Sequence, residues 1–203
     1  AASSIDLGGP DRRKYSGSMR YLQMISSDSY VISTPQHIFV GGGVEEDIDA
    51  IADVAAGELK SVFIDSGTAK TLSLPRVIER ALAATVLAWF RAEYDLSSGA
   101  AATAANVAQQ LFTEGSTGCI SLTAHATQTV ALFPTLDLVF ADTLGESVHI
   151  RLPPTSYLEI WPDYHAMCLL IDGESDESTA ILAAGFLRRY YTLFDRENSL
   201  IGV

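Results

Sequence analysis

The chain has 203 residues, of which 13 are Lys or Arg and 25 are Asp or Glu, so its formal net charge is −12. Its apolar content of 48% excludes an intrinsically disordered chain and is enough for a sizeable core. The acidic balance argues against nucleic acid or an anionic membrane surface as a partner. The longest weakly polar stretch, Ala81–Phe90, is about half of the roughly 20 residues that a membrane span needs.

The first 60 residues predict short strands, turns and an acidic connection. Residues 19–25 alternate apolar and polar side chains, and residues 30–40 continue a strand pattern that ends at three consecutive glycines. Residues 41–60 form an acidic insert with six carboxylates between Glu45 and Glu58. We interpret it as a solvated segment between two strands, because the ligand spacing and central glycine of an EF-hand calcium loop are missing.

The middle of the chain predicts a buried strand and two helices. Leu59–Ile64 is a short apolar run that ends in a tight turn at Asp65-Ser66-Gly67. Pro75–Tyr94 is the longest predicted helix, and a proline in its first turn sacrifices no hydrogen bond. Ala100–Phe112 is predicted as a second, alanine-rich helix. The core-facing residues of the first helix recur at helical spacing and are Ile78, Leu82, Val86, Trp89 and Phe90.

The last third of the chain returns to strands. Alternating side chains at residues 136–140 and 148–152 predict a β-hairpin around a turn at residues 142–146. Residues 190–194 and 200–203 predict a final hairpin. The predicted fold class is therefore mainly β, with one long helix and short helices.

Asp65 is the residue whose position most strongly suggests chemistry. An aspartate at the end of a buried strand is unfavourable unless hydrogen bonds satisfy its charge. Ser66 and Thr68 offer hydroxyl groups, and Gly67 lets the backbone turn close to the carboxylate. By itself this tetrapeptide is also explained as an Asx turn at a strand end.

Other kinds of site have weaker support in the sequence. The four histidines show neither helical pairing nor clustering, so no metal site is expected. The nucleophile-elbow motif of serine hydrolases does not occur, and the three glycines at residues 41–43 lack the Lys-Ser/Thr of a phosphate-binding loop. No cofactor is expected.

Several separate segments, in one particular order, resemble the C-terminal lobe of pepsin-family aspartic proteases. The resemblance extends over nearly the whole chain, from Leu7-Gly8-Gly9 to Val203. It implies a pepsin-like lobe of orthogonally packed sheets or a closed double-psi-type barrel. The matching segments are Asp65–Thr68, Thr71–Pro75, Phe133–Leu136, Ile181–Leu182, Gly185–Asn198 and Ile201–Gly202.

The resemblance implies a role for each residue of the Asp65 turn. Asp65 is expected to be one of two catalytic aspartates, which share a proton because two close carboxylates do not both ionise easily. One carboxylate activates a water as general base while the other, protonated, polarises the scissile carbonyl of a polypeptide substrate. Ser66 is expected to bond across to the other lobe, and Thr68 to the outer oxygen of Asp65. Ala69 and Lys70 are expected to lie near the substrate.

The two cysteines acquire a meaning only through the resemblance. Cys119 and Cys168 fall where the pepsin-like lobe carries a disulfide, whereas the number of cysteines alone decides nothing. The resemblance therefore implies a bridge and a secreted, endomembrane or lysosome-like acidic compartment.

The sequence contains one Asp-Ser/Thr-Gly motif, and the catalytic pair needs two. We therefore expect residues 1–203 to be a single C-terminal lobe that is inactive alone, with the N-terminal lobe absent. Its expected partner is the N-terminal lobe of the same protein, supplied in one chain or as a second chain. A two-fold pair of self-copies, which would bring two Asp65 side chains together, is the weaker alternative.

The chain departs from the family pattern at two places. The family has two apolar residues and then glycine in the strand beneath the active-site turn, and here the triplet is Ile181-Leu182-Ala183. The Ala183 methyl is expected to crowd the Asp65 turn. Ala184-Gly185 replaces an aspartate and an apolar residue, and Ala69-Lys70 replaces hydroxyl or apolar residues. These departures favour the alternative of a non-catalytic pepsin-like protein-binding or structural module.

Overall fold

The computed structural model describes residues 5–26, 29–41, 52–54, 59–97, 99–113, 118–121, 126–174 and 178–203. Most of the acidic insert at residues 41–60 lies outside these ranges, so its predicted solvation is not described. Within the insert, Ala52–Val54 forms a strand, β4.

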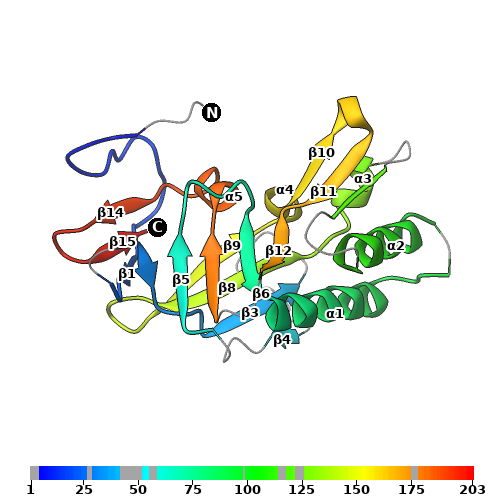
Figure 1. Ribbon diagram of the computed structural model, residues 1–203, viewed down its shortest axis with the longest axis horizontal. Helices are drawn as coiled ribbons and strands as arrows, with labels where there is room; N and C mark the ends of the chain where they lie inside the picture. The colour runs from blue at the N-terminus through cyan, green and yellow to red at the C-terminus, as the bar shows by residue number, and fades with distance from the viewer. Residues whose placement is uncertain are drawn as a thin grey trace.

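The described strands form four sheets, and the two larger ones cross each other in Figure 1. The five-stranded sheet has the order β12 (Ile171–Glu174), β6 (Leu72–Pro75), β13 (Thr179–Leu182), β5 (Ser61–Ile64) and β2 (Val31–Ile32). The four-stranded sheet has the order β4, β3 (His37–Gly41), β8 (Thr135–Ala141) and β9 (Ser147–Leu152).

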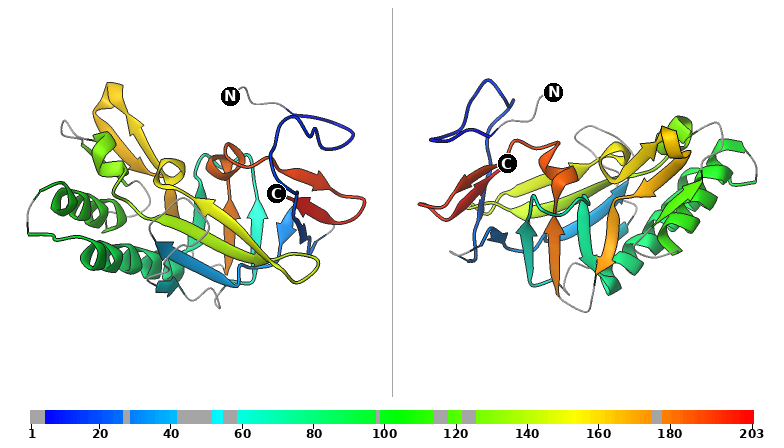
Figure 2. Two further views of the ribbon diagram at one scale, coloured as in Figure 1. Left: turned by 180° about the vertical axis from the view of Figure 1, so that it is seen from behind. Right: turned by 45° about the horizontal axis from the view of Figure 1, so that its top comes forward.

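Two three-stranded sheets complete the described β structure. One has the order β1 (Tyr21–Gln23), β15 (Leu200–Gly202) and β14 (Leu193–Asp195). The other has the order β10 (Leu158–Trp161), β11 (Ala166–Leu169) and β7 (Cys119–Ser121). The β10–β11 hairpin projects from the body of the molecule in Figures 1 and 2.

The architecture confirms the predicted mainly β fold class. Of the two forms that the sequence left open, the described strands adopt open sheets and close no barrel. The end strands of the five-stranded sheet, β12 and β2, do not pair with each other, so the sheet is open between them; β2 also bridges Met24 through Ile32.

Both helices predicted for the middle of the chain form and pack beside the sheets. The apolar stripe predicted for the first helix is buried as expected on α1 (Arg76–Glu93). Pro75 is the last residue of β6 and also the N-cap of α1, so it lies just before the first helical turn and not within it. The second helix, α2 (Gly99–Thr113), lies alongside α1 at one end of the molecule (Figure 1). The remaining helices are short and comprise α3 (Ala126–Val130), α4 (Pro154–Tyr157), α5 (Ala184–Leu187) and a 3₁₀ turn at Pro162–Tyr164.

The hairpin predicted from alternation forms as β8 and β9. Its turn is held by Asp142, whose carboxylate accepts the N–H groups of Leu144 at 2.8 Å and Glu146 at 2.9 Å. The guanidinium of Arg20 pairs with the same carboxylate at 2.6 Å. The register of the hairpin is fixed because alternate residues of β9 are buried in the core, so a slip of one residue would expose them.

The final hairpin is shorter than predicted. Its first strand, β14, begins at Leu193 and not at Tyr190. Tyr190 is instead engaged with the backbone of Arg151 on β9: its hydroxyl accepts the Arg151 N–H at 2.7 Å and donates to the Arg151 carbonyl at 2.9 Å. A tertiary contact of this kind leaves no periodic signal in the sequence.

Cys119 and Cys168 form the disulfide that the resemblance implied. It links β7 to β11 at directly paired positions and closes a loop with a sequence separation of 49 residues. A cross-link restricts the unfolded chain, which raises the free energy of unfolding more for longer loops.

We predict that replacing both Cys119 and Cys168 by Ala lowers the free energy of unfolding by about 2–4 kcal/mol, because the unfolded chain regains the entropy that the loop had removed. Urea denaturation followed by circular dichroism measures this. The unchanged protein under strong reductant should match the double variant, and an unaltered denaturation midpoint on reduction would contradict a stabilising role.

Candidate active site

The turn at Asp65 joins β5 to β6 at one edge of the five-stranded sheet, where α5 also follows β13 (Figure 1). Strand β13 lies between these two strands, parallel to β5 and antiparallel to β6. Four backbone hydrogen bonds tie the end of β13 and the residues that follow it to the Asp65 turn and to the residues after that turn. They run from Asp65 N–H to Leu182 O (3.0 Å), Ala183 N–H to Thr71 O (3.0 Å), Ala184 N–H to Thr68 O (3.1 Å) and Gly185 N–H to Lys70 O (3.1 Å).

The Asp65 carboxylate accepts one hydrogen bond on each of its oxygens. The Gly67 N–H donates to Oδ1 at 2.8 Å, and the Thr68 hydroxyl donates to Oδ2 at 2.7 Å. Both bonds favour the charged form, so the Gly67 N–H and then the Thr68 hydroxyl hold the pKa of Asp65 below its ordinary value of 3.8. Asp65 is half-buried and Ser66 is exposed, so a negative charge is presented at the surface in a fixed orientation.

The two residues after the turn, Ala69 and Lys70, have different surroundings. Ala69 is exposed. The ammonium group of Lys70 lies 3.9 Å from the carboxylate of Asp172 on β12, which is 8% exposed. The cation that the resemblance placed near the substrate therefore has a carboxylate partner on the neighbouring strand.

In the triplet Ile181-Leu182-Ala183, the first two residues end β13 and Ala183 follows it, beside the Asp65 turn. Leu182 and Ala183 are fully buried, and Ala183 has an extended backbone with φ of −114°. The Ala183 methyl is buried at this position, and the Ala183 backbone N–H still donates to the Thr71 carbonyl oxygen.

The residue that has no room for a side chain in this region is Gly185, which sequence reasoning noted only as a departure. A Cβ on Gly185 would lie 1.8 Å from the hydroxyl oxygen of Thr71 and 2.9 Å from the Thr71 Cα. That hydroxyl donates to the Ser156 carbonyl of α4, and Thr71 is fully buried. The lack of a side chain at Gly185 therefore lets α5 approach the strand that follows the Asp65 turn.

The described residues offer no alternative metal centre, because they contain no group of three or more His, Cys, Asp or Glu placed to hold an ion. His37 lies on β3, His149 on β9 and His165 between the 3₁₀ turn and β11, and His125 is outside the described residues. No helix in the described ranges is long and apolar enough to cross a membrane.

Comparison with known families identifies the family to which the chain belongs. The sequence model of the eukaryotic aspartyl protease family matches residues 1–203, the whole chain. A comparison with curated proteins found no match. The chain therefore belongs to the eukaryotic aspartyl protease family, in agreement with the resemblance that its segments carry.

We predict that Gly185→Ala lowers the free energy of unfolding by about 1–3 kcal/mol, because the added methyl overlaps Thr71 in a packed region. Thermal and urea unfolding measure the loss. The companion variant Ala183→Gly, which restores the family residue, should destabilise by about 1 kcal/mol or less. Stabilisation by Ala183→Gly would instead support the crowding that the sequence suggested.

We predict that Thr68→Val raises the pKa of Asp65 towards 3.8, since the hydroxyl that favours the charged form is lost. Carboxyl-carbon NMR titration measures this, and Ser66→Ala should leave the pKa unchanged. A lowered folded-state pKa gives stability that is present above the unfolded pKa and is lost as pH falls through the folded pKa. The valine variant should therefore lose less stability between pH 4 and pH 2, and an unchanged pKa would contradict the assignment.

Proposed function

We propose that this chain is one lobe, the C-terminal half, of an aspartic endopeptidase and that Asp65 is one of its two catalytic aspartates. The observation that carries the proposal is the Asp65 carboxylate, held on both oxygens at a surface turn. Family membership of the whole chain supports peptidase chemistry in general. The single Asp-Ser/Thr-Gly motif supports the assignment as half of the active site.

In this proposal the two lobes bring their aspartates together across a cleft. A second carboxylate facing Asp65 raises the cost of ionising both, so the pair shares one proton and titrates as a unit. The ionised member takes a proton from the attacking water, and the protonated member donates to the carbonyl oxygen of the scissile peptide bond. Among the described residues no second carboxylate hydrogen-bonds to Asp65, which supports another lobe as the source of the second acid.

The substrate is a polypeptide that lies extended across the cleft and forms backbone hydrogen bonds as an added strand does. Acidic pH favours the reaction because one aspartate must be protonated. The disulfide and the family together support a secreted or lysosome-like compartment as the setting. The partner is the N-terminal lobe, with a second copy of this chain as the alternative, and no cofactor or metal takes part.

A non-catalytic module is the second candidate, favoured by one observation. Ala183, Ala184 and Gly185 replace the glycine, aspartate and apolar residue of the family pattern directly beside the active-site turn. In that case the lobe retains the fold and binds protein partners without hydrolysing them.

Cleavage of a denatured protein at acid pH by the two-lobed protein tests the proposal. We expect Asp65→Asn to reduce the rate by at least about 10²–10⁴-fold, because the substitution preserves shape but removes a proton-transferring group. Asp95→Asn is the matched control, since Asp95 also caps a surface turn, accepting the Ser97 N–H at 2.9 Å. The lobe alone should be inactive.

Two outcomes would contradict the proposal. Equal activity of the unchanged protein and Asp65→Asn would remove Asp65 from the mechanism. An inactive two-lobed protein that still binds polypeptides would support the non-catalytic module.

A further inference from the structure

Adjacent basic residues occur at two places in the sequence, Arg12-Arg13-Lys14 and Arg188-Arg189. An endopeptidase that selects paired basic residues recognises both places by their charge, but it cuts only where the backbone can open into an extended strand. Exposed loops with few backbone hydrogen bonds meet this condition, and a helix end packed on the core does not. The two places therefore share a recognition sequence and differ in how the fold holds them.

The first basic cluster lies in an exposed loop. Every residue from Ile5 to Ser18 is exposed except Asp11 and Tyr15, which are half-buried, and these residues form no helix or strand. Figures 1 and 2 show this part of the chain, in dark blue, as a loop that extends from the body of the molecule. Among the described residues, one backbone–backbone hydrogen bond holds the loop internally, from the Lys14 N–H to the Asp11 carbonyl at 2.9 Å. Opening the loop therefore breaks little structure.

The basic side chains of this loop form surface ion pairs. The Arg13 side chain is 88% exposed, and its guanidinium donates to both oxygens of Asp11, at 2.9 and 2.8 Å. Lys14 is held at 2.5 Å by Asp6, and its side chain is only 35% exposed. Because a surface ion pair adds little to stability, an acidic subsite of a peptidase can replace Asp11 as the partner of Arg13. Arg13 is thus more accessible to such a subsite than Lys14.

The chain after the loop is anchored to the fold independently of the loop. The Tyr15 ring stacks on Tyr191, with the ring centroids 5.1 Å apart. Five residues later, the Arg20 N–H donates to the Val203 carbonyl at 3.0 Å, and the Val203 N–H donates back to the Arg20 carbonyl at 2.9 Å. A cut before Tyr15 therefore leaves the attachment of β1 to the final hairpin in place.

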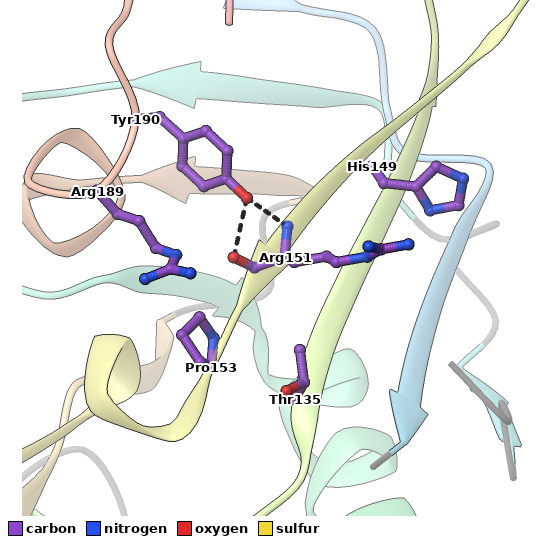
Figure 3. A pocket seen from close by; sticks show the side chains of 6 residues that line it. All are labelled: Thr135, His149, Arg151, Pro153, Arg189 and Tyr190. Carbon is purple, nitrogen blue, oxygen red and sulfur yellow. Dashed lines mark hydrogen bonds between the residues drawn. The ribbon is translucent and has the colours of Figure 1, made fainter. Parts of the chain in front are cut away.

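The second basic pair, Arg188-Arg189, is exposed as well, but its backbone is held. The N–H groups of both arginines donate to carbonyls of α5 at 2.9 Å, and Phe186 of that helix is fully buried. The next residue, Tyr190, is tied through its hydroxyl to the Arg151 backbone on β9, as the dashed lines in Figure 3 show. Opening this place into an extended strand would unwind α5 and expose part of the core.

We propose that the peptide bond between Arg13 and Lys14 is a processing site for an endopeptidase selective for paired basic residues. Arg13 enters the subsite next to the scissile bond and Arg12 the preceding one, because two acidic subsites suit two successive guanidinium groups. Water hydrolyses the bond, so that the Arg13 carbonyl becomes a carboxylate and the Lys14 nitrogen becomes an ammonium group. The site is independent of the proposed peptidase activity of the chain, because it uses no residue of the Asp65 turn.

Limited proteolysis of the chain tests the site. The chain is incubated with a subtilisin-like endopeptidase selective for paired basic residues, and in parallel with trypsin, which accepts single basic residues. Intact mass and N-terminal sequencing identify the products. With the paired-basic enzyme we expect the first product to begin at Lys14, and this cut to be at least about 10-fold faster than a cut after Arg189. A first cut at any other bond, or no cut, would overturn the proposal.

Three variants separate recognition of the pair from general surface charge. Arg13→Gln should slow the cut before Lys14 at least about 10-fold, whereas Arg188→Gln, which removes the same charge from the other pair, should change it less than about 2-fold. Arg12→Gln should slow the paired-basic enzyme but not trypsin. Equal slowing by Arg13→Gln and Arg188→Gln, or no effect of Arg12→Gln on the paired-basic enzyme, would contradict the proposal.

Circular dichroism distinguishes processing from degradation. Because the chain after the loop is anchored at Tyr15 and Arg20, residues 14–203 should keep the spectrum of the uncut chain. Loss of that spectrum on cutting would overturn the assignment as a processing site. Unchanged spectra of the three uncut variants establish that they fold.

Discussion

The backbone hydrogen bonds between the end of β13 and the Asp65 turn fix both the sheet and the carboxylate. Because β13 pairs with β5 on one side and β6 on the other, its register is set twice. A shift by one residue would exchange the faces of Ile181 and Leu182, and Leu182 is fully buried. Because β5 comes before the Asp65 turn and β6 comes after it, the pairing of both strands with β13 fixes the position of Asp65.

The proposed hydrolysis depends on how the surrounding hydrogen bonds affect the ionisation of a single acid, Asp65. Hydrogen bonds from Gly67 and Thr68 stabilise the ionised form of Asp65, which lowers its pKa. In a pair of catalytic carboxyl groups one acid must keep its proton. Repulsion between two nearby carboxylates meets this requirement, because it disfavours ionising both. In the proposed two-lobed enzyme, this chain would supply one ionised carboxylate, and the neutral partner would arise only when the two lobes pair.

The departures beside the turn show how a packed region accepts an unusual sequence. The family pattern has glycine at the position of Ala183, and here the methyl is buried without loss of the hydrogen bond to Thr71. The close approach occurs two residues later, where Gly185 passes the Thr71 hydroxyl.

Local pattern in the sequence determined the long α1 helix, the β8–β9 hairpin and the tight turn at Asp65, because periodicity and turn chemistry act over a few residues. The resemblance of ordered segments supplied the family and the Cys119–Cys168 bridge. Only the tertiary structure decided that Lys70 pairs with Asp172, that Gly185 must lack a side chain and that Tyr190 closes the edge of β9. These contacts join residues tens of positions apart, and no local period encodes which distant groups the packing of sheets brings together.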